Sequence, residues 1–333
     1  MHDLYIIESP FQLLCATEAN LQLGGKRGVL IVYCDRRRTR NEAQIQAVLS
    51  LDLAKWEKVV FVRYKSPWSL YFKLSFLKNI ELRKFDLDKV FVGNFLAGTL
   101  VSFGASFKAR EFFFLDDGAA SLAQHAFPPR KLGVKTLLRK IFLTFLGLNA
   151  SVSIWDKSIF TIFGDSIHKF SDIRRHSFQT IAKKLKDDAK CEIEKGKVML
   201  IGQCMVERGV MEKENYFHLI RNVLKSLPSN CYVEYISHRD EDPSNVAEIT
   251  REFAIHSRTL GVPIEIFMMI SRYLPEKCLA FYSTALFTVP LFFPDVEYLY
   301  VKIPSGMLKT RRDSISEIYN QFSNVKYLNE FKI

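Results

Sequence analysis

Three segments of the 333-residue chain place reactive side chains directly after an apolar run. In the first, the apolar residues 112–115 lead into Asp116, Asp117 and Gly118. A buried strand here would carry both carboxylates to its carboxyl end, where neighbouring negative charge and partial loss of solvent raise the proton affinity of one of them. The segment is therefore a candidate general base. The alternative is an ordinary Asp-Asp-Gly turn.

The second segment, residues 232–237, also has a strand pattern and ends in His238 and Arg239. An imidazolium and a guanidinium at this position could bind a phosphate and offset charge that grows on a leaving group. A histidine with a purely structural role is the alternative.

The third segment, residues 279–282, ends in Ser283 and Thr284, which open a predicted helix. Hydroxyls and unpaired backbone amides at the start of a helix suit a phosphate. Alternatively, Ser283 only caps that helix. Three strand ends with carboxylates, His/Arg and hydroxyls together favour a functional site over three separate turns.

The elements that position these residues alternate between short β-branched or aromatic runs and amphipathic stretches, which predicts an α/β fold with parallel sheets and crossover helices. Such sheets bind ligands at the carboxyl ends of their strands. A helix should begin at Ser9, with Pro10 in its first turn, and stop at Gly24-Gly25. A second helix is predicted over 41–53. The predicted strands cover 4–7, 29–32, 59–62, 90–92, 111–115, 198–201, 231–236 and 279–282.

Chain length and a hydrophobic content of 48% are enough for two cores. The alternation weakens between about 165 and 197, where lysine and arginine crowd a polar segment. We therefore predict a first domain over 1–165, a linker region over 166–194 and a second domain over 195–333.

Six scattered cysteines indicate a reducing compartment, and the chain opens on a strand pattern instead of a signal peptide. We expect a cytoplasmic protein. The apolar stretch 278–294 is marginal in length for a membrane span and is expected to be buried core.

A net charge of +11 implies an acidic partner, for which nucleic acid, an anionic membrane and a phosphorylated or carboxylated substrate are the candidates. The chain lacks a P-loop, a dinucleotide-binding glycine motif and zinc-ligand spacing. Asp86-Leu87-Asp88 matches the D-x-D pattern of metal-dependent glycosyltransferases, but it precedes the strand 90–92 and is interpreted as a polar loop.

Read in chain order, Asp116-Asp117-Gly118, His238 and Ser283-Thr284 resemble the acidic-acidic-Gly, His-Pro and Ser-Ser/Thr motifs of the bacterial sialyltransferases. The opening Ser9-Pro10-Phe11-Gln12-Leu13-Leu14 also resembles the start of lipooligosaccharide sialyltransferases and polysialyltransferases. One position departs from the pattern: Arg239 replaces the family proline, which leaves the backbone of His238 less constrained.

The resemblance implies a GT-B fold, in which two Rossmann-like domains face each other across a cleft, with the acceptor mainly in the first and the nucleotide mainly in the second. It further implies that Asp116 deprotonates the acceptor hydroxyl and that His238 protonates or hydrogen-bonds the departing phosphate. The other implied acceptor-side residues are Ser9, Gln12, Asp117 and Gly118, and the other implied donor-side residues are Gly202, Gln203, Arg239, Glu265, Ser283 and Thr284. Of these, Ser283 and Thr284 would hold the phosphate through their hydroxyls, and Glu265 would bind the nucleotide ribose.

The leading hypothesis is an inverting glycosyltransferase that moves a sialic acid from its cytidine monophosphate (CMP) conjugate to a lipooligosaccharide or capsule glycan. A monophosphate leaving group carries less charge than a diphosphate, so we expect no required metal and no cofactor. A transferase for CMP-activated pseudaminic, legionaminic or 3-deoxy-octulosonic acid is the nearest alternative. A non-catalytic protein that binds nucleic acid or another polyanion is the alternative from another class, although we expect no nucleic-acid partner.

Two stretches, 63–83 and 130–145, interleave basic and apolar residues. They could dock at an anionic membrane surface and bring the protein to a lipid-linked acceptor at the inner face of the cytoplasmic membrane. Helices that pack on a sheet with their lysines in water are the alternative. The residues concerned are Trp68, Phe72, Lys73, Phe76, Lys78, Lys131, Lys135, Arg139, Lys140 and Phe142.

Overall fold

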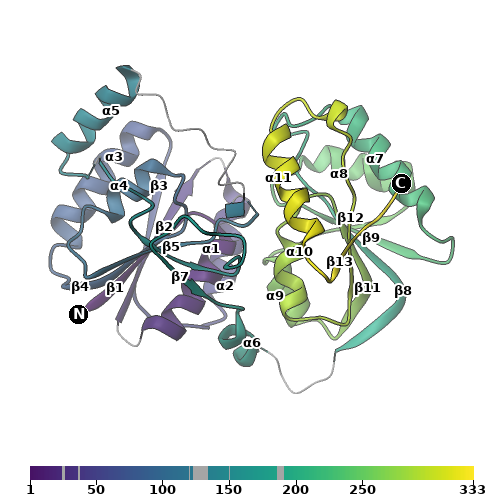
Figure 1. Ribbon diagram of the computed structural model, residues 1–333, viewed down its shortest axis with the longest axis horizontal. Coiled ribbons are helices and arrows are strands. Elements are labelled where there is room, and N and C mark those ends of the chain that lie inside the picture. Colours follow the sequence, from purple (N-terminus) through teal and green to yellow (C-terminus); the bar gives the residue numbers. More distant parts are fainter. Residues whose placement is uncertain (25–26, 37, 120, 123–133, 150, 186–190) are drawn as a thin grey trace. The chain divides into compact units, whose positions relative to one another are not determined.

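The computed structural model describes residues 1–333 except 25–26, 37, 120, 123–133, 150 and 186–190. It contains two compact units. Of the described residues, the first unit comprises those from Met1 to Ser121 and from 134 to Lys184, and the second comprises Leu122 and those from Leu185 to Ile333. Each unit is built around one parallel sheet (Figure 1).

The sheet of the first unit has the strand order β3-β2-β1-β4-β5-β6-β7, and all its strands are parallel. Helices α1 and α2 lie on one side of it and α3, α4 and α5 on the other (Figure 1). The elements are β1 (His2–Ile7), α1 (Pro10–Ala19), η1 (Asn20–Gly24), β2 (Arg27–Asp35), α2 (Thr39–Leu49), β3 (Trp56–Tyr64), α3 (Pro67–Phe76), η2 (Leu77–Glu81), β4 (Leu87–Val92), α4 (Gly98–Gly104), β5 (Glu111–Leu115), α5 (Val134–Phe145), β6 (Ser158–Thr161), β7 (Asp172–Arg175) and α6 (Gln179–Leu185).

Local sequence explains how these elements begin. Strands covered by helices on both faces are apolar along their whole length, and the inner strands are accordingly buried. The side chain of Ser9 accepts a hydrogen bond from the backbone N–H of Gln12 at 3.2 Å, so the predicted cap of α1 is confirmed. The helix continues past Ala19 as a π-helical turn that ends at Gly24, and Gly25 lies outside the described residues.

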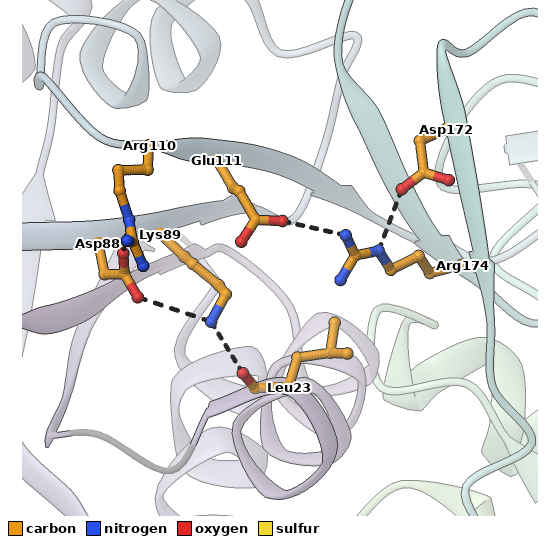
Figure 2. A network of polar contacts seen from close by, with 7 residues as sticks. All are labelled: Leu23, Asp88, Lys89, Arg110, Glu111, Asp172 and Arg174. Carbon is orange, nitrogen blue, oxygen red and sulfur yellow. Dashed lines mark hydrogen bonds and ion pairs between the residues drawn. The ribbon is translucent and has the colours of Figure 1, made fainter.

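The predicted linker over 166–194 is wrong for its first part, because residues up to Lys184 belong to the first unit. Strand β7 extends the sheet beside β6, and Arg174 of β7 donates to Glu111 of β5 at 3.0 Å (Figure 2). Glu18 of α1 accepts hydrogen bonds from the first backbone amides of α6, including that of Ile181 at 2.9 Å. Polar residues crowd this segment because its strand is short and lies at the sheet edge.

The Asp86-Leu87-Asp88 segment is not a loop as predicted, because β4 begins at Leu87. Asp88 is buried near the amino end of β4, where its carboxylate accepts a hydrogen bond from Arg110 and lies 3.8 Å from Nζ of Lys89 (Figure 2). These cations neutralise the carboxylate at the edge opposite to the carboxyl ends of the strands. Asp88 therefore has a structural role.

The second sheet has the order β10-β9-β8-β11-β12-β13 and is also parallel. The predicted core segment 278–294 is confirmed as mostly buried, since it forms the end of β11 and the two short helices α10 and η4 after it. Among the described residues, no helix has both the length and the hydropathy to cross a membrane. The elements are β8 (Glu192–Ile201), α7 (Lys213–Ser226), β9 (Tyr232–Ser237), α8 (Pro243–Phe253), β10 (His256–Thr259), α9 (Ile264–Met269), β11 (Tyr273–Ala280), α10 (Ala285–Thr288), η4 (Val289–Leu291), β12 (Glu297–Tyr300), η5 (Ser305–Met307), α11 (Arg312–Ser323) and β13 (Leu328–Glu330).

Candidate active site

Both sheets reverse their strand order next to their first strand, between β1 and β4 in the first unit and between β8 and β11 in the second. Ligands of open parallel sheets bind at the carboxyl ends of the strands beside such a reversal. Most of the predicted site residues follow these ends within their own unit. They are Ser9 after β1 and Asp116–Gly118 after β5, then Gly202–Gln203 after β8, His238–Arg239 after β9 and Ser283–Thr284 after β11.

Asp116 is fully buried at the tip of β5. Thr161 Oγ1 donates to its Oδ1 at 2.6 Å, and the backbone N–H of Ile162 donates to its Oδ2 at 2.8 Å. Burial raises the pKa of Asp116 to about 7, although these two hydrogen bonds lower it. A carboxyl group with this pKa exchanges its proton near neutral pH, as a general base must.

His176, which directly follows β7, was missed by the sequence analysis. Its Nε2 lies 3.8 Å from Oδ2 of Asp116, and its ring stacks on Phe160 with 4.2 Å between the ring centroids. Neither ring nitrogen has a hydrogen-bond partner among the described residues. Burial lowers the pKa of His176 to about 3. The imidazole is therefore neutral at physiological pH and adds no positive charge beside Asp116.

Asp117 is half-buried and is held from α1, because Gln12 Nε2 donates to its Oδ1 at 2.6 Å. Gln12 is fixed in turn, since its Oε1 accepts the backbone N–H of Glu8 at 2.8 Å. Gly118 has a φ of +68°, which favours glycine, and its carbonyl accepts the N–H of Ser121. The turn interpretation of this segment is thus confirmed, whereas the catalytic role of its carboxylates stays a prediction. Ser9 caps α1, which carries Gln12.

Figure 1 places β9 beside β8 in the second unit, and His238 leaves the end of β9 half-buried. Its Nδ1 accepts the backbone N–H of Asp240 at 3.0 Å. An acceptor Nδ1 carries no proton, so the ring proton of the neutral imidazole is on Nε2. His238 is therefore arranged to donate a hydrogen bond through Nε2.

Glu241 anchors the turn that carries His238 and was also missed. Its carboxylate accepts the backbone N–H of His238 and, at 2.5 Å, the hydroxyl of Tyr235. Tyr235 and Tyr216 share a hydrogen bond of 2.9 Å, and Gln203 donates its backbone N–H to Tyr216 at 3.0 Å. Burial raises the pKa of Glu241 to about 7. This buried network joins the ends of β8 and β9.

Gly202, one of the implied donor-side residues, packs directly against this network. A Cβ at this position would lie 2.3 Å from Oη of Tyr235 and 2.6 Å from Oε2 of Glu241. The space beside Gly202 is already occupied by the buried network, which explains the need for glycine.

Replacing Gly202 by alanine should destabilise the second unit by about 1–3 kcal/mol, because the added methyl group overpacks the network. Gly261→Ala is the matched control, since no atom lies within 4 Å of a Cβ built there. It should leave stability within about 1 kcal/mol of the parent. Urea unfolding measures both variants, and equal effects would contradict the packing argument.

Gln203 connects β8 to β11 across the strand reversal, because its Oε1 accepts the backbone N–H of Tyr282 at 2.9 Å. It therefore supports the segment that carries Ser283 and Thr284. The hydroxyl of Ser283 accepts the N–H of Ala285 at 3.3 Å. The interpretation of Ser283 as the cap of this helix is wrong, however, because the N-cap residue of α10 is Thr284. Both hydroxyl residues are half-buried at the same edge as His238.

Glu265 lies buried in α9 and accepts a hydrogen bond from Thr288 Oγ1 at 2.5 Å, which ties α9 to α10. Burial raises the pKa of Glu265, and the guanidinium of Arg239 is close enough to lower it in part. Arg239 and Glu265 therefore interact electrostatically at this edge of the sheet. The ribose contact of Glu265 stays a prediction.

Two clusters of the described residues have atoms within 4.8 Å of one another that could hold a metal. One consists of Cys15, Asp116 and His176, and the other of Cys204, His238 and Asp240. In the first cluster both oxygens of Asp116 already accept hydrogen bonds. In the second, Nδ1 of His238 accepts the backbone N–H of Asp240.

The family model for alpha-2,8-polysialyltransferase (POLYST) matches residues 3–302. The chain belongs to this family. The resemblance found in the sequence is thereby confirmed, and membership of the polysialyltransferase family identifies the protein as a glycosyltransferase. No curated protein matches the chain.

Solved structures confirm the GT-B fold of this polysialyltransferase family member. UDP-GlcNAc 2-epimerase from Neisseria meningitidis bound to UDP-GlcNAc has a TM-score of 0.53 at 12% identity, over 97% of this chain and 91% of that chain. The S. aureus MnaA-UDP co-structure has a TM-score of 0.52 at 13% identity, over 97% and 87%. UDP-GlcNAc 2-epimerase from Methanocaldococcus jannaschii has a TM-score of 0.52 at 10% identity, over 98% and 94%. At these identities the likeness concerns the fold alone.

Proposed function

We propose that the protein transfers a sialic acid from CMP-sialic acid to a bacterial cell-surface glycan, either lipooligosaccharide or capsule, with inversion at the anomeric carbon. The observation that carries the proposal is Asp116, a carboxyl group at the tip of β5 with a pKa of about 7, in a chain of the polysialyltransferase family.

The reaction is a single displacement. Asp116 takes the proton of the acceptor hydroxyl while the acceptor oxygen forms a bond to the anomeric carbon. The bond from that carbon to the phosphate oxygen breaks, and CMP leaves with the bonding electron pair. Attack on the face opposite to the leaving group inverts the configuration.

Negative charge grows on the phosphate oxygen as CMP leaves. The Nε2–H of His238 donates to this oxygen, supported by the hydrogen bond from Asp240 to Nδ1. Ser283, Thr284 and Arg239 lie at the same sheet edge and bind the remaining phosphate oxygens. No metal is required in this scheme.

Asp116 is preferred over Asp117 as the base for an electrostatic reason. Burial raises the pKa of Asp116 into the neutral range, where a base is most effective. Asp117 is half-buried and bonded to Gln12, and it orients the acceptor. An acceptor hydroxyl can reach Asp116 only if the covering side chains move, because the carboxyl is fully buried.

Incubation with a panel of CMP-activated acid sugars tests the proposal. We expect CMP release to be fastest with CMP-sialic acid, to persist in a chelator, and to yield a product of inverted anomeric configuration by NMR. Faster release from a CMP-activated pseudaminic, legionaminic or 3-deoxy-octulosonic acid would identify that sugar as the donor in place of sialic acid. The proposed mechanism would remain unchanged.

Nucleotide binding can be measured without an acceptor. Cytidine nucleotides should raise the melting temperature, because a ligand that binds only the folded state stabilises it. Uridine diphosphate with manganese should not. The opposite ranking would contradict a CMP donor, and a shift with any polyanion would favour the non-catalytic alternative.

A further inference from the structure

The helices α3 and α5 of the first unit, together with the π-helical turn η2, carry more apolar side chains than their packing uses. Their inner faces are buried through residues such as Leu74, Leu77 and Leu143. Their outer faces are apolar as well, and the side chains there are between 53% and 84% exposed. We call this outer face the aromatic stripe, and it consists of Trp68, Phe72, Phe76, Ile80, Leu137, Leu138, Ile141 and Phe145.

The stripe is continuous because Phe142 joins the two helices. Its ring lies 4.8 Å from that of Trp68 and 5.9 Å from that of Phe72, measured between centroids. The hydroxyl of Ser75 donates to the carbonyl of Leu146 at 2.8 Å, and Lys78 donates to that of Gly147. Figure 1 shows α3 and α5 on the same side of the sheet. Single exposed apolar residues are normal, but a contiguous apolar surface marks an interaction site.

The charges that α3 and α5 carry beside the stripe are positive, and the one acidic residue of η2, Glu81, is paired with Nζ of Lys58 at 2.7 Å. Lys73 is exposed, Arg139 and Lys140 are half-buried, and neither α3 nor α5 contains an acidic residue. Lys131 and the side chain of Lys135, which were predicted to contribute, lie outside the described residues. Lys78 and Phe142 were also predicted to contribute, but both are half-buried and engaged between the helices.

The combination of large apolar side chains and flanking cations fits an anionic lipid surface. A second copy of the chain fits less well, because a symmetric contact through the stripe would bring the same cations against each other. We propose that the aromatic stripe inserts into the acyl boundary of an anionic membrane while Lys73, Arg139 and Lys140 contact lipid phosphates. The binding itself is independent of the proposed transferase activity, but its purpose, to reach a lipid-linked acceptor, rests on it.

Flotation of the full-length protein with vesicles tests the proposal. Vesicles of phosphatidylethanolamine and phosphatidylglycerol should bind the protein, and vesicles of phosphatidylcholine should not. Salt should weaken binding, since the screening length falls from about 8 Å at physiological ionic strength to about 3 Å at 1 M. Equal binding to both vesicles, or no binding to the anionic ones, would overturn the proposal.

The triple variant Phe76→Ser, Ile80→Ser and Phe145→Ser removes exposed side chains that lie beyond the Phe142 contact. It should lower partitioning at least about tenfold, because three apolar side chains no longer enter the lipid. The matched control changes Ile193, Ile270 and Tyr273 to serine, which are exposed apolar residues of the second unit; this control should bind like the parent. Lys73→Glu with Lys140→Glu should also weaken binding.

The same variants separate the other outcomes. A dimer that the triple variant abolishes, without vesicle binding by the parent, would assign the stripe to a second copy and overturn the lipid proposal. Hydrolysis of the soluble CMP-sugar should be unchanged in the triple variant. If the parent itself does not hydrolyse the CMP-sugar, the proposed transferase function is refuted. The vesicle result would still support membrane binding by the stripe.

Discussion

Replacing Asp116 by asparagine is expected to lower kcat/KM for sialic acid transfer by about 10²–10⁴, the usual contribution of a general base. The amide has nearly the shape of the carboxylate but cannot accept the proton of the acceptor hydroxyl. Binding of CMP, which we assign to the second unit, should stay within about twofold. Initial rates and a nucleotide titration measure the two effects separately.

Asp117→Asn is the matched control for this variant. Its amide oxygen can still accept the hydrogen bond from Gln12 Nε2, which the carboxylate accepts at 2.6 Å. We expect it to retain activity within about tenfold of the parent. A severe loss in Asp117→Asn with a mild one in Asp116→Asn would move the base to Asp117.

The pH dependence of kcat/KM distinguishes a general base from a purely structural role of Asp116. The base acts when deprotonated, so kcat/KM should fall as the pH drops below the pKa of about 7. The hydrogen bond from Thr161 lowers this pKa. Thr161→Val removes that bond and should move the acidic limb to higher pH, with activity recovered in alkaline buffer. A uniform loss at every pH would indicate damage to the fold instead, and the melting temperature should be recorded in parallel.

The sequence was informative where burial imposes a pattern. Strands such as β1, β2 and β5 lie between helix layers, so their apolar runs predict them from the sequence alone. The strand β10, His-Ser-Arg-Thr, is exposed at an edge, and β7, Asp-Ile-Arg-Arg, also ends a sheet. Such strands are held by backbone pairing with one neighbouring strand. Their side chains do not form the apolar run by which a buried strand is predicted from sequence. The missed β7 caused both the misplaced linker and the failure to notice His176.

The candidate site was predictable to the extent that it follows strand ends. Asp116 and His238 were found because an apolar run stops at a charged residue. Their partners were not, because the contact between Asp116 and Thr161 joins residues 45 apart through the pairing of β5 with β6. The packing role of Gly202 was not predicted for a related reason: the side chain beside it, Tyr235, belongs to a strand whose facing residues the sequence alone does not give.

His238→Asn is expected to lower kcat by about 10² or more, because it removes the group that donates to the leaving phosphate. The amide oxygen of asparagine can replace Nδ1 as the acceptor of the Asp240 N–H, which keeps the turn after β9 in place. His238→Gln is the companion variant, since its amide nitrogen can reach the position of Nε2 and still donate. Initial rates at saturating donor measure both variants.

The two variants distinguish hydrogen bonding from proton transfer. If the neutral imidazole only donates a hydrogen bond, glutamine should restore activity to within about tenfold of the parent, whereas asparagine should not. If His238 must give up its proton, both variants should be equally impaired. In either case the defect should shrink with a donor that carries a better leaving group, because such a donor needs less stabilisation in the transition state. An equal loss with every donor, or full activity in His238→Asn, would remove His238 from the leaving-group role and leave Asp116 as the only assigned catalytic residue.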